Sequence, residues 1–118
     1  MANDPKAQAA LASELGYVWL AARQIASWDL KRSVGQNAAW ARGTLAELEL
    51  LGAIYGGRAF RRKAALASVH AQCAQLREIA GDGSFPVTST KRQFQRYVDD
   101  WQNKAWDDLA REAIKALG

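Results

Sequence analysis

Residues Lys6–Trp28 read KAQAALASELGYVWLAARQIASW, and they open a stretch that continues to Phe85 without a proline. Proline removes a backbone donor and clashes with the preceding turn, so its absence permits long uninterrupted helices. Alanine, leucine, glutamine, arginine and lysine fill the stretch, and all of them favour helix. The two prolines of the chain, Pro5 and Pro86, stand where helices would begin.

Apolar residues recur along the chain at spacings of three and four, the period of a helix with one buried face. Asp4 before Pro5 predicts an N-cap and a first helix that runs to about Ser27 or Trp28. The expected buried stripe of this helix is Leu11, Leu15, Val18, Ala22 and Ile25. The stripes of the next three helices are Ala38, Ala41, Leu45, Leu48, Leu51 and Tyr55; Phe60, Leu66, Val69, Cys73, Leu76 and Ala80; and Phe94, Val98, Trp101, Ala105, Leu109 and Ala113.

Glycines separate these predicted helices, since glycine adopts the left-handed conformation of a helix end without steric cost. We expect connections near residues 29–33, 56–58 and 81–89, and a last helix that ends near Leu117. Gly52 and Gly56 have the spacing that allows close approach of a second helix. Two capping-box patterns mark helix starts: Ser33 with Gln36, and Thr90 with Gln93.

Four helices with short connections predict an all-α fold, a single up-down-up-down four-helix bundle that occupies residues 1–118 as one domain. Apolar residues make up 49% of the chain and charged residues 24%, as in folded proteins generally. No apolar run is long enough to span a bilayer, and the N-terminus does not resemble a signal peptide. A single cysteine, Cys73, fits a reducing compartment. We therefore expect a cytoplasmic protein that does not bind membranes.

The densest basic cluster opens the third predicted helix and consists of Arg58, Arg61, Arg62 and Lys63. Cations at a helix N-terminus oppose the helix dipole, at a cost of roughly 0.3–1 kcal/mol each when exposed. One interpretation is a phosphate-binding patch, because arginine matches the geometry of phosphate oxygens. The other is that these cations pair with Asp107, Asp108 and Glu112, which the antiparallel topology would bring to the same end.

A second basic group is divided between two segments that the up-down topology would bring to the opposite end of the bundle. Its members are Lys31, Arg32, Lys91, Arg92 and Arg96. The first pair is partly explained by its favourable place at a helix C-terminus. The other three begin the last predicted helix, so polyanion binding is the competing explanation for them. The net charge of +4 permits such binding without requiring it.

The chain contains five tryptophans, most of which lie on or beside the apolar stripes and are expected in the core. Trp28 and Trp40 fit their stripes worst. Tryptophan is enriched among interface anchors, so these two residues are candidates for binding a protein partner.

The sequence lacks the residue pairs of a catalytic or metal site. His70 and Cys73 lie three apart on one predicted helix, but no further Cys or His supplies the remaining metal ligands. A nucleophile and base would also need a third, orienting group. We interpret both residues as structural, and we expect neither an enzyme nor a cofactor or metal.

Residues Gly43–Glu49, GTLAELE, resemble a segment of the four-helix-bundle proteins that are encoded in ribosomal RNA intervening sequences. The accessory variability determinant of diversity-generating retroelements belongs to the same group. The resemblance implies a basic bundle that forms homo-oligomers and binds a reverse transcriptase and nucleic acid. This chain is less basic than that group, and no functional residue is carried over. In size and charge the chain is also similar to the small helical subunit of CRISPR effector complexes.

These observations lead to one functional hypothesis and one alternative. The hypothesis is a non-catalytic accessory protein of a nucleoprotein complex, which binds RNA or DNA through its basic bundle ends and also binds a protein partner. The alternative is a protein-only adaptor or inhibitor of phage or mobile-element origin that docks through surface aromatics. Salt dependence separates the two, because phosphate binding weakens steeply as ionic strength rises.

Overall fold

The structure, a computed structural model, describes the backbone of residues 5–118 and the side chains of Lys6 and of residues 14–118. The predicted N-cap Asp4 and the side chain of Leu11 lie outside this described part. The described residues form helices and connections, with no strand. The elements are α1 (Pro5–Arg32), α2 (Gln36–Tyr55), the 3-10 turn η1 (Gly57–Ala59), α3 (Arg62–Ala80), α4 (Phe85–Asp99) and α5 (Asp107–Leu117).

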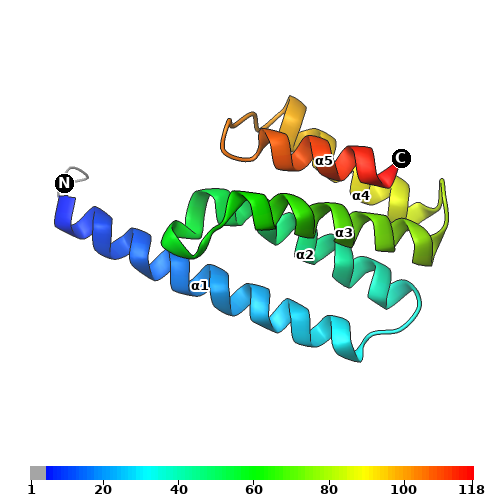
Figure 1. Cartoon of the computed structure of the whole chain (residues 1–118), viewed down its shortest axis with the longest axis horizontal. Coiled ribbons are helices and arrows are strands. Elements are labelled where there is room, and N and C mark those ends of the chain that lie inside the picture. The colour runs from blue at the N-terminus through cyan, green and yellow to red at the C-terminus, as the bar shows by residue number, and fades with distance from the viewer. Residues whose placement is uncertain (1–4) are drawn as a thin grey trace.

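The fold is therefore all-helical, as predicted, but a four-helix bundle is not confirmed, because the described residues form five α-helices. Helices α2 and α3 run antiparallel through the middle of the molecule (Figure 1). Helix α1 packs along α2 on one side, and the α4–α5 hairpin covers the other side. Within the described residues α1 contacts α2 and η1 but none of the other helices.

The predicted helix boundaries hold where proline and glycine set them. Helix α1 begins at Pro5, and α4 begins at Phe85 with Pro86 in its first turn. Helix α2 ends before Gly56, and α3 ends before Gly81, which has a φ of +91° that favours glycine. Proline and glycine set these helix ends through their own backbone conformation, so the boundaries do not depend on tertiary contacts.

Both capping-box predictions are wrong. Gly35 occupies the N-cap of α2, and the hydroxyl of Ser33 instead donates to the carbonyl of Asp29, at 2.6 Å, within the last turn of α1. Thr90 lies inside α4, because that helix begins six residues earlier than this pattern predicts, with Ser84 at its N-cap.

The prediction of one continuous last helix is also wrong, since residues 100–106 separate α4 from α5. Asn103 organises this turn: its side-chain oxygen accepts from the amide of Ala105 at 2.8 Å, and its carbonyl accepts from the amides of Trp106 and Asp107. The indole of Trp106 donates to the carbonyl of Tyr97 at 3.1 Å, which fixes the return of the chain onto α4. The reversal lets α5 bury its apolar face against α3 and α4.

The central core lies among α2, α3, α4 and α5. Val69, Cys73 and Leu76 of α3 are fully buried, as their stripe predicts, and so are Leu109 and Ala113 of α5. Several core residues of α2 lie off the predicted stripe, because α2 has neighbours on three sides. They are Ala39, Ala46 and Leu50.

The predicted stripe of α1 is wrong for two of its residues. Val18 and Ile25 are exposed, whereas Trp19 and Ala26 are buried against α2. Tyr55 and Trp101, which were expected on buried stripes, are also partly exposed. None of the described helices is both long and apolar enough to cross a membrane.

Candidate nucleic-acid interface

The basic cluster of the α2–α3 connection lies at the end of the molecule where α5 also begins. Arg58 belongs to η1, Arg61 is the N-cap of α3, and Arg62 and Lys63 occupy its first turn. No side chain caps this helix start and no acidic residue lies in its first turn. Cations therefore face the positive end of the α3 dipole, as the sequence indicates.

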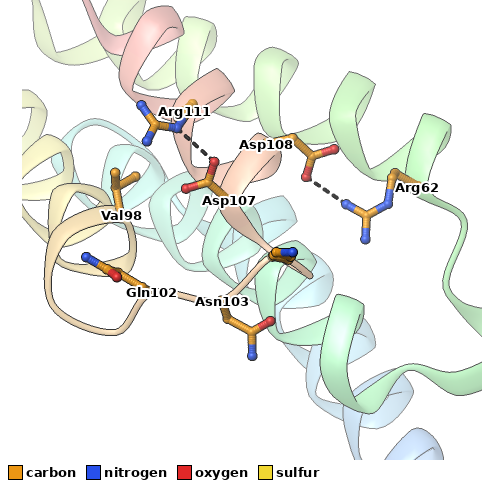
Figure 2. Close-up of a pocket in the computed structure, with 8 residues that line it drawn as sticks. Arg62, Val98, Gln102, Asn103, Asp107, Asp108 and Arg111 are labelled. Atoms are coloured by element: carbon orange, nitrogen blue, oxygen red, sulfur yellow. Dashed lines mark hydrogen bonds and ion pairs between the residues drawn. The ribbon is translucent and has the colours of Figure 1, made fainter.

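Arg62 is the member of the cluster that pairs with an acid of α5. Its guanidinium donates to the carboxylate of Asp108 at 2.7 Å (Figure 2). It also donates to the carbonyl of Ala105 at 2.9 Å. The same Asp108 oxygen accepts from the amide of Leu109 at the start of α5. Arg62 thus joins α3 to the beginning of α5, and for this arginine the ion-pair interpretation is confirmed.

The other two acids that the sequence offers as partners are engaged elsewhere. Asp107 pairs with Arg111, one turn further along α5, at 2.8 Å (Figure 2). Glu112 lies 3.0 Å from the ring of His70 on α3. Neither carboxylate is therefore bound to the cluster.

The remaining cations of this end have no carboxylate partner among the described residues. Arg58, Arg61 and Lys63 are exposed and form none of the ion pairs in the described part of the chain. Arg61 donates to the carbonyl of Arg58 at 2.6 Å, which leaves its charge uncompensated. Lys104, in the α4–α5 turn, is likewise exposed and pairs with no acid of residues 14–118. We call Arg58, Arg61, Lys63 and Lys104 the free cations of this end.

An open groove of about 780 Å³ lies at this end of the molecule, and Arg62 and Lys104 are the members of the two cation sets that line it. Figure 2 shows how the two ion pairs, Arg62–Asp108 and Arg111–Asp107, form one wall and how Gln102 and Asn103 lie across from them. Lys104 also lines the groove and was not singled out in the sequence, because the predicted helix would have continued through it. The lining is polar, so it suits a charged or strongly hydrated ligand better than an apolar one.

The second basic group is divided by the α2–α3 layer. Lys31 and Arg32 end α1, whereas Lys91, Arg92 and Arg96 belong to α4 on the other side of the molecule. Figure 1 shows both segments at the same end, but α1 and α4 make no contact within the described residues. The five cations therefore do not form one continuous surface.

The members of this second group also differ in their bonding. Arg32 lies 3.9 Å from Asp29, one turn earlier, and both side chains are exposed. Lys91 donates to the main-chain oxygen of Gly118 at 3.0 Å, at the end of α5. Arg92 and Arg96 are exposed on α4 and form no ion pair with another described residue.

Both tryptophans selected as partner anchors are exposed, Trp28 by 50% and Trp40 by 39%. Trp28 lies nine residues after the buried Trp19, which turns it to the opposite side of α1. Trp40 contacts Phe85 edge to face, with ring centroids 5.9 Å apart, and Phe85 is itself exposed. Phe85 belongs to the same aromatic pair but was missed, since it precedes a proline and looked like part of a loop.

His70 and Cys73 do not share a site. Cys73 is fully buried, and burial, assisted by the charge of Glu112, raises the pKa of its thiol to about 12. His70 is exposed and faces Glu112 instead. The described residues contain no group of three or more His, Cys, Asp or Glu side chains that could hold a metal ion.

Comparison with known protein families, with curated proteins and with solved structures finds no match to this chain.

Proposed function

We propose that this chain is a non-catalytic accessory protein of a nucleoprotein complex and that it binds RNA or DNA through the free cations around the start of α3. The observation that carries the proposal is that Arg58, Arg61 and Lys63 are exposed at an uncapped helix start without a carboxylate partner among the described residues. Electrostatic attraction to phosphates is the main source of sequence-independent nucleic-acid binding.

Arg62 has a supporting role in this proposal. Its bonds to Asp108 and Ala105 hold the α4–α5 turn against the start of α3, and Arg62 and Lys104 line the same groove. Contacts between such cations and the phosphates of a nucleic acid fix its position and carry no sequence information. The proposed binding is therefore general for nucleic acid.

The test compares two variants of equal net charge. Arg58→Gln with Lys63→Gln removes two free cations, whereas Ala71→Glu with Gln75→Glu changes the net charge equally at exposed positions beyond the first turns of α3. We expect the first variant to bind mixed-sequence RNA or DNA at least about tenfold more weakly. For duplex DNA, the plot of log K against log salt concentration should become less steep, with the magnitude of its negative slope reduced by about 1.8. The control should retain most of the affinity.

The melting temperature supplies a second, independent readout. Removing Lys63 relieves an unfavourable interaction with the helix dipole, so the first variant should melt at the same temperature or higher. Arg62→Gln should melt earlier, because it leaves Asp108 without its partner. Equal loss of affinity in the test and control variants would show that net charge alone is responsible, and the proposed site would then be wrong.

Exposed aromatics favour a second candidate, a protein-only adaptor or inhibitor. Trp40 and Phe85 form an exposed aromatic pair beside a small groove of about 210 Å³ between α2 and α4. Docking through such a surface depends little on salt. A partner whose affinity is unchanged by added salt but is lost in Trp40→Ala would favour this candidate over nucleic-acid binding.

A further inference from the structure

Helix α1 carries a second apolar line on the side that faces away from α2. Four apolar residues, with one charged residue before them and one after them, follow one another along it at spacings of four, three, four, three and four, which is the heptad spacing of a coiled-coil seam. We call these residues the outer seam of α1: Glu14, Val18, Ala21, Ile25, Trp28 and Arg32.

Every residue of the outer seam is exposed. The exposed fractions are 63% for Val18, 54% for Ile25 and 50% for Trp28. The opposite side of α1 meets α2 through Trp19 and Ala26, and of the other elements in the described structure only η1 reaches α1 (Figure 1). Single exposed apolar residues are common, but a continuous line of them marks an interaction surface.

We propose that the outer seam binds the outer seam of a second copy of this chain, with the two α1 helices antiparallel. The two-fold axis would cross the outer seam at the level of residue 23 along the helix, midway between Glu14 and Arg32. Val18 then packs on Trp28 of the partner subunit, and Ala21 packs on Ile25 of the partner subunit. The two-fold symmetry repeats each of these contacts, which gives four apolar layers. They lie between two polar layers, one at each end of the seam.

The charges at the two ends determine this choice of partner and direction. In the antiparallel arrangement Glu14 meets Arg32 of the partner subunit, twice by symmetry, so that opposite charges close both ends. A parallel arrangement would place Glu14 against Glu14 and Arg32 against Arg32, which is repulsive. A shift of one heptad would place Glu14 against Ile25 of the partner subunit. The seam is thus complementary to itself in one direction and one register.

The flanking positions agree with this arrangement. Residues beside the seam pair with the equivalent side of the partner helix, so Lys31 lies across from Tyr17 of the partner subunit, and Gln24 lies across from its own copy. No two like charges approach each other along the paired helices. The seam spans 19 residues, an axial length of about 27 Å, which is short for a coiled coil. The dimer should therefore dissociate on dilution.

Sedimentation equilibrium over a range of concentrations tests the surface. Ile25→Glu should weaken the dimer at least about tenfold, because it places a carboxylate in a central apolar layer. Leu20→Glu is the matched control, since Leu20 is also an exposed apolar residue of α1 but lies off the seam. This control should dimerise like the wild type, and far-ultraviolet circular dichroism should show that both variants keep their helices.

Charge exchange tests the direction. Glu14→Arg and Arg32→Glu should each weaken the dimer, because each places like charges at both ends of the antiparallel seam. The double variant, Glu14→Arg with Arg32→Glu, should recover the wild-type affinity. In a parallel pair the double variant would dimerise no better than the single variants. That result would show that the antiparallel direction is wrong.

Two further results would overturn the proposal as a whole. One is a wild-type chain that remains monomeric up to about 1 mM, which would leave the seam to a different kind of partner. The other is a dimer that Ile25→Glu does not weaken. Neither result depends on nucleic-acid binding, because the outer seam contains none of the free cations at the start of α3.

Discussion

A single glycine, Gly52, determines how closely α1 approaches α2. A methyl group on its Cα would lie 2.4 Å from Cζ2 of Trp19, closer than two carbon atoms can approach. The indole of Trp19 uses this proximity to donate to the carbonyl of Leu48 at 2.6 Å. The Gly52 and Gly56 spacing in the sequence allows such an approach, and the structure identifies Trp19 as the residue that fills it.

Gly52→Ala should therefore destabilise the protein although alanine favours helix. Overpacking a core contact costs roughly 1–3 kcal/mol, whereas the gain in helix propensity is about 1 kcal/mol. Gly43→Ala, also within α2, is the control, because its added carbon would lie 3.4 Å from Leu76 and Thr90. Urea unfolding should show Gly52→Ala to be less stable than the wild type and Gly43→Ala to be equally or more stable.

The carboxyl group of Glu49 should make stability depend on pH. Glu49 is buried between α1 and α2, and its carboxylate accepts from Arg23 at 2.6 Å. Burial raises the pKa of Glu49 above its ordinary value of 4.5, and the hydrogen bond and charge of Arg23 oppose that rise. The unfolded chain thus releases this proton at a lower pH than the folded protein does. The stability contributed by this group is complete below its unfolded-state pKa and is lost as the pH rises through its folded-state pKa.

Glu49→Gln removes this titration. The unfolding free energy of the variant, relative to the wild type, should therefore increase as the pH is raised from about 4 to about 7. Arg23→Met should show a steeper loss of stability with pH than the wild type, because the ionised Glu49 would lose its partner. A difference between Glu49→Gln and the wild type that stays constant with pH would contradict the raised pKa.

At the scale of elements, two tryptophans on the ring of Tyr97 explain the break between α4 and α5. Both Trp101 and Trp106 meet this ring edge on, with centroids 5.0 Å apart, but only Trp106 also donates its indole hydrogen to the carbonyl of Tyr97. An uninterrupted helix over residues 85–117 would exceed the length of α2 or α3 and carry Leu109 and Leu117 past the core. The return of the chain keeps both leucines buried.

Substituting each of these tryptophans by phenylalanine separates packing from hydrogen bonding. Trp106→Phe keeps an aromatic ring but leaves the Tyr97 carbonyl without this donor, at an expected cost of about 0.5–1.5 kcal/mol. Trp101→Phe should cost less, since Trp101 is half exposed and donates no indole hydrogen bond to another described residue. Equal losses of stability in urea unfolding would mean that ring packing alone holds the turn.

The sequence predicts some elements better than others for identifiable reasons. Pro5, Pro86 and Gly81 mark helix ends through the backbone itself, so those boundaries were predictable. Periodicity shows which faces of α1 are apolar but not which face a neighbour covers, and Val18 and Ile25 were therefore misplaced. The break after Asp99 depends on contacts made by Trp106, which a helical pattern does not show.

The candidate site was predictable to a similar extent. The unusual position of cations at the start of α3 is visible in the sequence. The sequence does not show which of these cations is paired. Only the position of Asp108 in the structure distinguishes the paired residue, Arg62, from the three free cations. Lys104 joined the site only because the predicted last helix is broken beside it.

At the scale of the whole molecule, α1 is attached to a core that it does not share. The central cluster of buried apolar residues runs from Ala39 to Leu117 and contains none of the described side chains of α1. In the described structure α1 is held by one face, through Trp19, Ala26 and the Arg23–Glu49 ion pair. Elements with few buried contacts open with a smaller free energy than the core does. Helix α1 should thus be able to separate while α2 to α5 stay folded.

Native-state hydrogen exchange can measure this separation directly. Backbone amides of residues 19–30 should exchange through an opening whose free energy is smaller than that for residues 69–76 of α3, which lie in the core. Gly52→Ala should accelerate exchange in α1 much more than in α3, because its collision with Trp19 acts on the attachment of α1 alone. If the outer seam pairs with a second copy, raising the protein concentration should slow the exchange of α1 in the wild type but not in Ile25→Glu. Exchange of both segments at the free energy of global unfolding would instead mean that α1 folds as one unit with the core, and its single covered face would then be enough to hold it.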